Sequence, residues 1–301
     1  MLGRVSGLLK PCYLFAPRTL LRRVRLGRGP SAPAQSVRLP WGVTLEVNPH
    51  ETIGRELVRQ NVFDIAVTET LWRLLGEGDV AVDAGANIGY VTTLMAARVG
   101  PLGRVEAFEP HPDVFARLRH NATRAAAGGS LAPIGLHQCA LGAQDGSARL
   151  FEPGAFDANH GTATLAHGAR PDAGPAGLEV RVARLDSVCG AGAISLLMLD
   201  VEGFEAQVLR GAARLLGEGR IRHIVYEAHE CERSELHELL QRAGYAVFGL
   251  GYDLLGPRVT AGTAAPRIDR RWESPSYLAT LTPDEARRVL TPRGWRVLRP
   301  C

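Results

Sequence analysis

The sequence predicts an α/β fold built on a mostly parallel β-sheet. From Val80 onward, short apolar segments alternate with segments of helical periodicity, which is the pattern of strands joined by crossover helices. A glycine-rich turn follows the first of these strands, at a place where such folds commonly bind a ligand. With 301 residues, 46% of them hydrophobic, the chain is long enough to bury one large core.

Seven apolar segments are expected as strands: Val80–Asp83, Arg104–Glu109, Gly135–Ala140, Ser195–Asp200, Ile221–Glu227, Tyr245–Gly249 and Tyr277–Leu281. Helical periodicity predicts helices between them, at Tyr90–Val99, Pro112–Ala127, Phe204–Leu216 and Glu232–Ala243. A capping sequence, Thr282-Pro283-Asp284-Glu285, begins a last helix that ends near Leu290. Two stretches interrupt the alternation, Pro153–Gly177 and Leu255–Pro275, and both are expected to be long functional loops.

The first 78 residues precede this alternating region and fall into two parts. Residues 1–35 form a basic extension that we expect to be flexible; a transit peptide, or an arm lying on an anionic membrane or glycan surface, is the alternative. Residues 36–78 hold a hairpin over Ser36–Val47 and a helix over Asp64–Leu75 that Gly76 ends. Residues 79–301 form the main domain.

Charge and composition exclude several classes of function. Residues 1–45 carry eight basic side chains and no acidic one, so the remainder of a chain with net charge +4 is acidic and is not predicted to bind nucleic acid. No stretch of about 20 apolar residues is present, so no transmembrane helix is expected. The five cysteines fit no zinc-binding spacing, so we expect no metal site and reduced thiols in a cytoplasmic protein.

The glycine-rich turn runs Asp83-Ala84-Gly85-Ala86-Asn87-Ile88-Gly89. Its G-x-x-x-G spacing differs from the fingerprint that cradles a dinucleotide pyrophosphate, and the leading carboxylate would repel a pyrophosphate. A carboxylate there suits a cationic ligand such as S-adenosylmethionine, which carries an ammonium and a sulfonium group. Glu109 ends the second strand, where an acidic residue accepts hydrogen bonds from ribose hydroxyls, whereas Glu106 is expected to be a surface charge.

Two further strands end in acidic residues. Asp200 ends the apolar segment before Val201-Glu202-Gly203-Phe204-Glu205, and it is expected to face the reacting centre. Glu202 and Glu205 also suit the positive end of the helix that follows, so capping is their alternative role. Glu227 and His229 follow the next strand. We name Asp200, Glu227 and His229 as candidates for a general base that removes a hydroxyl proton.

Several segments together resemble the FkbM family of S-adenosylmethionine-dependent methyltransferases. The most specific are Val82–Tyr90 (VDAGANIGY), Phe108–Pro112 (FEPHP) and Asp200–Glu205 (DVEGFE); shorter matches are Ile53-Gly54-Arg55, Glu69-Thr70, Asn121, Ala140-Leu141-Gly142, Leu185-Asp186-Ser187, Leu209-Arg210-Gly211 and Tyr226-Glu227. The resemblance implies a Rossmann-like class I methyltransferase fold with a seven-stranded sheet, helices on both faces and an antiparallel last strand. It also implies a set of cofactor-binding residues: Asp83, Gly85, Asn87 and Gly89 at the methionine end, Glu109 at the ribose, and Ala140 and Leu141 near the adenine.

The resemblance further implies O-methylation of a hydroxyl on a sugar, a glycan or a secondary metabolite. One departure bears on activity, because Met198 stands where the family usually has lysine. Met198 keeps open a non-catalytic relative that binds the cofactor. A second, less favoured alternative is a nucleotide-dependent oxidoreductase, which would need a pyrophosphate cradle that this turn does not provide. The sequence does not identify the acceptor, whose recognition we expect in the two long loops and the N-terminal segment, and it says nothing of the oligomeric state.

Overall fold

A central sheet of eight strands forms the middle of the part of the chain that the computed structural model describes, namely residue 11 and residues 34–151, 164–165, 177–189, 192–228, 233–262 and 275–298. The strand order is β13-β12-β14-β11-β10-β3-β4-β5. The strands are β3 (Val80–Ala84), β4 (Arg104–Phe108), β5 (Ile134–His137), β10 (Ile194–Leu199), β11 (Ile221–Glu227), β12 (Ala246–Asp253), β13 (Gly256–Ala261) and β14 (Ser276–Thr280). Their pairing confirms the α/β fold and the mostly parallel sheet, since only β13 and β14 run against the others.

The seven predicted strands are present, and the last of them, β14, is antiparallel as the resemblance implied. The eighth strand, β13, is a correction, because it lies within Leu255–Pro275, which we expected to be a loop. Gly256 and Pro257 favoured a loop there, but the backbone pairs with β12 in a tight hairpin. Residues 263–274 of that predicted loop lie outside the described residues.

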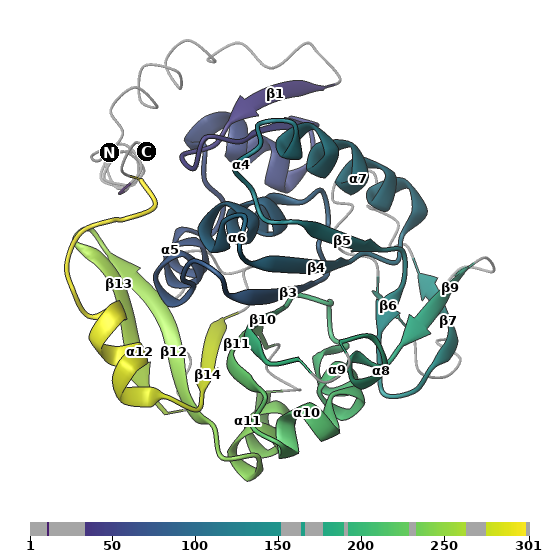
Figure 1. Cartoon of the computed structure of the whole chain (residues 1–301), viewed down its shortest axis with the longest axis vertical. Coiled ribbons are helices and arrows are strands. Elements are labelled where there is room, and N and C mark those ends of the chain that lie inside the picture. Colours follow the sequence, from purple (N-terminus) through teal and green to yellow (C-terminus); the bar gives the residue numbers. More distant parts are fainter. Residues whose placement is uncertain are drawn as a thin grey trace, which may run out of the picture.

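Helices cover both faces of the central sheet (Figure 1). On one face Ala81 and Leu196 join a core with α5 (Ile65–Leu74), α6 (Tyr90–Val99) and α12 (Pro283–Leu290). On the other face Val82 and Leu197 join a core with α9 (Glu205–Gly211), α10 (Ala213–Gly217) and α11 (Arg233–Arg242). Consecutive residues of a strand point to opposite faces, so β3 and β10 are apolar at all but one position each, Asp83 and Ser195. Two further helices are α7 (Pro112–Ala126), which packs on α6 and β2, and α8 (Leu185–Val188).

The predicted helix Phe204–Leu216 is in fact two helices, α9 and α10, which meet at Ala212. Glycine at position 211 allows this junction to lie close to the segment that contains Gly142, since a Cβ at position 211 would lie 1.9 Å from the Gly142 carbonyl oxygen. The predicted strand Gly135–Ala140 is also divided. Its first part is β5, and its end, β6 (Ala140–Leu141), belongs to a second sheet.

That second sheet was not predicted. Its order is β6-β9-β7-β8, with β7 (Gly146–Phe151), β8 (Thr164–Leu165) and β9 (Leu178–Ala183). Leu150, Val180 and Val182 form its small core with Phe204. Most of the predicted loop Pro153–Gly177 lies outside the described residues, and Thr164–Leu165 within it is a strand.

The predicted hairpin before the main domain is confirmed as β1 (Gln35–Arg38) paired with β2 (Thr44–Val47). The helix α4 (Thr52–Gln60) between the hairpin and α5 was not predicted. Buried Val37, Leu45 and Leu57 join the core that α5 and α6 share. The basic extension falls outside the described residues except for residues 11, 34 and 35, so the expected flexible extension and its alternatives stay predictions.

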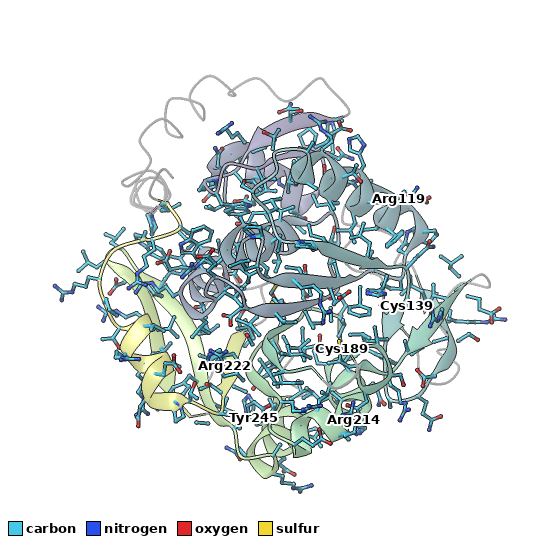
Figure 2. The ribbon with its side chains drawn as sticks, in the orientation of Figure 1. Arg119, Cys139, Cys189, Arg214, Arg222 and Tyr245 are labelled. Atoms are coloured by element: carbon cyan, nitrogen blue, oxygen red, sulfur yellow. The ribbon has the colours of Figure 1, made fainter. Side chains whose placement is uncertain are left out.

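No helix in the described ranges combines the length and apolar composition needed to cross a membrane. Cys139 and Cys189, both labelled in Figure 2, carry free thiols.

Candidate active site

Four carboxylates come together where the central strands end. Asp83 lies near the end of β3 and Glu227 ends β11, while Glu109 follows β4 and Asp200 follows β10. These four strands are adjacent and parallel, so their carboxyl ends share one edge of the sheet. The Asp200 N–H donates to the Ala84 carbonyl at 3.0 Å, which fixes Asp200 beside the glycine-rich turn. The structure therefore brings together these four residues of the predicted site.

The glycine-rich turn crosses this edge in a backbone conformation that side chains rarely allow. Gly85, Asn87 and Gly89 have φ values of +85°, +48° and +91°. The Gly85 N–H donates to the Phe108 carbonyl at 3.0 Å, which joins the turn to the end of β4. A Cβ on Gly85 would lie 1.8 Å from the Asp200 carbonyl oxygen. Glycine at position 85 is therefore needed both for its φ and for its contact with Asp200.

Substituting Gly85 with alanine is expected to destabilise the protein more than the same change at Gly78. Both residues have positive φ, so both variants lose about 1–2 kcal/mol for the left-handed backbone. Gly78 has no heavy atom within 4 Å of its would-be Cβ, whereas Gly85→Ala also displaces Asp200, at a further cost of about 1–3 kcal/mol. Urea unfolding of the two variants measures the difference, and equal losses would show that the contact with Asp200 costs nothing.

Glu109 is buried and already holds two backbone groups. Its Oε2 accepts the Asn87 N–H at 3.0 Å, and its Oε1 accepts the His111 N–H at 2.9 Å. Burial raises the pKa of Glu109 to about 7, although both hydrogen bonds act in the opposite direction. A carboxylate has about four acceptor positions, so Glu109 can still accept hydroxyl groups such as those of a ribose. This residue fits the nucleoside part of the expected cofactor.

Asp83 is fully buried, and its Oδ2 accepts the Thr92 hydroxyl of α6 at 2.6 Å. Burial raises the pKa of Asp83 to about 7, and the negative charge of Asp200 adds to this rise. Sequence reasoning missed Thr92; the signal for it is a polar residue on the buried face of a helix that directly follows the turn. A carboxylate held in this way would be stabilised by a cationic group, so it fits the charged part of the expected cofactor.

These raised pKa values predict an unusual pH dependence of stability. Unfolding returns Asp83 and Glu109 to ordinary pKa values near 4, so between about pH 4 and 7 the folded state binds more protons than the unfolded state. Their contribution to the free energy of unfolding therefore falls as the pH rises through this window. Comparing wild type with Asp83→Asn by urea unfolding from pH 4.5 to 8 isolates one group. The wild-type curve is expected to fall more steeply, and parallel curves would contradict the assigned shift.

The acidic segment after β10 contains two glutamates with different roles. Glu205 begins α9 and accepts the backbone N–H groups of Val201 and Gly203 at 3.1 and 3.4 Å, so these bonds hold the loop before the helix and do not cap the helix, which has no side-chain cap bond. Glu202 instead has φ +51°, rare for a residue with a side chain, and burial beside Asp200 raises its pKa to about 8. Glu202 therefore belongs with the strand-end carboxylates.

Glu227 and Asp200 come from neighbouring strands, in which Leu199 pairs with Tyr226. Burial raises the pKa of Glu227 well above its usual range, and the negative charges of Asp200 and then Asp64 raise it further. Asp64 comes from the segment before α5 and was not predicted to lie near the site. His229, the third candidate base, lies outside the described residues, so its role stays a prediction.

The remaining predicted residues lie in or beside the core. Ala140 and Leu141 are buried in β6, which pairs with β9, and their proximity to an adenine stays a prediction. Met198 is 3% exposed and belongs to the apolar core, and it pairs in register with Asp83 of β3. A lysine here would stand beside the buried carboxyl of Asp83, whereas methionine fits as an apolar core residue. Glu106 is partly exposed and pairs with Arg104 and His137, as expected of a surface charge.

Comparison with known proteins identifies the family of this chain. A family model described as the methyltransferase FkbM domain matches residues 83–247. The 31-O-demethyl-FK506 methyltransferase FkbM of Streptomyces tacrolimicus is 32% identical over 247 residues, which is 71% of this chain and 89% of that protein. The hexuronic acid methyltransferase AglP of Haloferax volcanii is 28% identical over 156 residues, 51% of this chain and 57% of that protein.

Among solved structures, the methyltransferase FkbM of Methylobacillus flagellatus aligns with a TM-score of 0.41 at 17% identity, covering 75% of this chain and 60% of that one. The family model spans more than half of the present chain and includes the glycine-rich turn, Glu109, Asp200 and Glu227. The chain belongs to the FkbM family of S-adenosylmethionine-dependent methyltransferases.

Proposed function

We propose that the chain is an O-methyltransferase that methylates a hydroxyl group of a sugar, a glycan or a secondary metabolite. The observation that carries this proposal is the pair Asp200 and Glu227, which end adjacent strands beside the glycine-rich turn. Two similar proteins have names that fit it, one a 31-O-demethyl-FK506 methyltransferase and the other a hexuronic acid methyltransferase. We keep Asp83, Gly85, Asn87, Gly89, Glu109, Ala140 and Leu141 as the proposed cofactor-binding residues, and Asp200, Glu227 and His229 as the proposed catalytic residues.

S-adenosylmethionine supplies a methyl group bound to a positively charged sulfur. When it is bound, transfer would break the carbon–sulfur bond and form a carbon–oxygen bond to the acceptor, and the hydroxyl proton would leave to a base. Asp200 and Glu227 are placed at the sheet edge where they can accept that proton. A cation bound nearby favours the ionised form of both carboxyls, so the positive charge would counter the repulsion that raises the pKa of Glu227. Positioning of the hydroxyl in line with the methyl group supplies much of the rate.

Transfer of a radiolabelled methyl group tests the proposal. The purified protein is incubated with labelled S-adenosylmethionine and a panel of methyl glycosides, uronic acids and a hydroxylated macrolide. In parallel, calorimetric titration with S-adenosylhomocysteine and with NADH identifies the nucleotide that binds. Label in an O-methyl product supports the proposal. Binding of S-adenosylhomocysteine without transfer to any panel member would favour a non-catalytic relative, and binding of NADH alone would favour an oxidoreductase.

A further inference from the structure

Hydrogen bonds connect the glycine-rich turn to the segment that precedes the main domain. Asn121 of α7 is buried and joins the two. Its Nδ2 donates to the Ile88 carbonyl in the turn at 2.9 Å and to the Glu46 carbonyl of β2 at 3.1 Å. Its Oδ1 accepts the Glu46 N–H at 2.9 Å. One side chain thus holds the middle of the turn against the hairpin.

Tyr90 makes a second connection at the end of the turn. It is the first residue of α6, directly after Gly89, and it is 4% exposed. Its hydroxyl oxygen lies 3.0 Å from the Phe63 nitrogen and 3.0 Å from Oγ1 of Thr68. The Thr68 hydroxyl in turn donates to the Phe63 carbonyl at 2.7 Å. The Tyr90 hydroxyl also donates to the Phe63 carbonyl at 3.2 Å, so these contacts close a hydrogen-bonded ring of Phe63, Tyr90 and Thr68 in which the Phe63 N–H donates and the Phe63 carbonyl accepts from both hydroxyls.

The ring joins two segments whose backbones are both strained. On one side, Asn87 and Gly89 have positive φ; on the other, Asn61 and Asp64 have φ values of +60° and +34°. A conformation of this kind persists only where its surroundings hold it. The aromatic ring of Tyr90 also packs edge-on against the aromatic rings of Trp41 and Phe63, at centroid distances of 5.2 and 6.4 Å. Tyr90 therefore stabilises the turn and the segment Asn61–Asp64 against each other.

We propose that Tyr90 is a positioning residue for the methyl donor, through the hydrogen bonds that connect the glycine-rich turn to Phe63 and Thr68. Only molecules whose turn is in the binding conformation can bind the donor. The apparent Kd is therefore the intrinsic Kd divided by the fraction of molecules in that conformation. The segment before the main domain, through Phe63 and Thr68, is thus part of what determines donor binding. This inference depends on the donor that the family uses and not on which acceptor is methylated.

The variant Tyr90→Phe tests this inference without any acceptor. It keeps the aromatic ring and the packing of that ring, and it removes only the hydroxyl group. Calorimetric titration with S-adenosylhomocysteine is expected to show that Kd rises about fivefold or more. Thr68→Val is expected to raise Kd as well. In the double variant, Kd should rise by less than the product of the two single increases, because both substitutions break the same hydrogen-bonded ring.

Tyr245→Phe is the matched control. Its hydroxyl is also buried and donates to a backbone carbonyl, that of Ile221, at 2.5 Å. Ile221 begins β11, at the sheet edge opposite Glu227, and Tyr245 lies beside α11 near the bottom of Figure 2. This variant should lower the melting temperature as Tyr90→Phe does but leave Kd within about twofold of wild type.

Two outcomes would overturn the inference alone: an unchanged Kd in Tyr90→Phe, or equal rises in Tyr90→Phe and Tyr245→Phe, which would reflect general destabilisation. Absence of S-adenosylhomocysteine binding in the folded wild type would overturn it together with the donor assignment. Failure to find an acceptor would contradict only the proposed O-methylation and would leave this result standing.

Discussion

Replacing Arg73 with methionine is expected to lower the free energy of unfolding by about 3–5 kcal/mol. Arg73 and Glu69 both lie in α5 with fully buried side chains, and Arg73 Nε donates to Glu69 Oε1 at 2.6 Å. Methionine would leave the Glu69 carboxylate buried without its cation. An uncompensated charge in the interior is far more costly than the loss of an ion pair on the surface.

The guanidinium group of Arg73 also holds the end of the chain. It donates to the carbonyls of Val289, Pro292 and Gly294 at 3.1, 2.7 and 2.6 Å. Glu69 accepts the backbone N–H groups of residues 296 and 297 at 2.8 and 2.9 Å. One buried pair thus fixes residues 289–297 to α5. Loss of the pair would leave without partners the backbone carbonyls that Arg73 binds and the backbone N–H groups that Glu69 binds.

Guanidinium-induced unfolding of Arg73→Met measures this effect, and Arg242→Met is the matched control. Arg242 pairs with Glu238 at the same spacing of four residues, but both side chains are mostly exposed, at 76% and 63%. The control is expected to change the free energy of unfolding by about 0.5 kcal/mol or less. Similar losses in both variants would contradict a special contribution from the buried pair.

This pair shows a limit of prediction from one sequence. Glu69-Thr70 was noted only as a match to the family, and a Glu and an Arg four residues apart look like an ordinary surface pair on a helix. The partners that reveal its role lie more than 200 residues away along the chain. Asn121 is a similar case, since its bonds to β2 and to the turn depend on how α7 packs and leave no local signal.

The central sheet could be predicted closely because its strands are buried on both faces. The segment Val80–Asp83 differs from β3 by one residue, and Ser195–Asp200 differs from β10 by one residue at each end. Continuous apolar runs that end in a carboxylate locate both the strand and its carboxyl end. That is why Asp83, Glu109, Asp200 and Glu227 could be assigned to one edge before any coordinates were known.

The second sheet could not be predicted for the opposite reason. Its strands β7 and β9 mix apolar with charged residues, and most of the segment that joins them is rich in glycine, alanine and proline. Pairing between them, from Gly146 with Val182 to Leu150 with Leu178, spans about thirty residues that carry no periodic pattern. A weak local preference of this kind is decided by tertiary contacts, such as those with Phe204.

The substitutions Asp200→Asn and Glu227→Gln are expected to lower kcat by about 10²–10⁴-fold if the two carboxylates act as base and partner. Affinity for S-adenosylhomocysteine should change by much less, because neither change removes Glu109 or the turn. Glu235→Gln removes an exposed carboxylate that pairs with Arg210, and as a control it should leave both values as in wild type. If kcat of both Asp200→Asn and Glu227→Gln stayed within about tenfold of the wild-type value, the base would lie elsewhere, and His229 would be tested next.

The pH dependence of the rate separates the base from its partner. The negative charge of Asp200 raises the pKa of Glu227, so removing that charge should lower it. If Glu227 is the base, the residual activity of Asp200→Asn should therefore persist to lower pH than that of wild type. If Asp200 is the base, the same variant loses the group itself, and no activity that extends to lower pH should remain. A shift of the acidic limb to lower pH in Asp200→Asn thus identifies Glu227 as the residue that takes the proton.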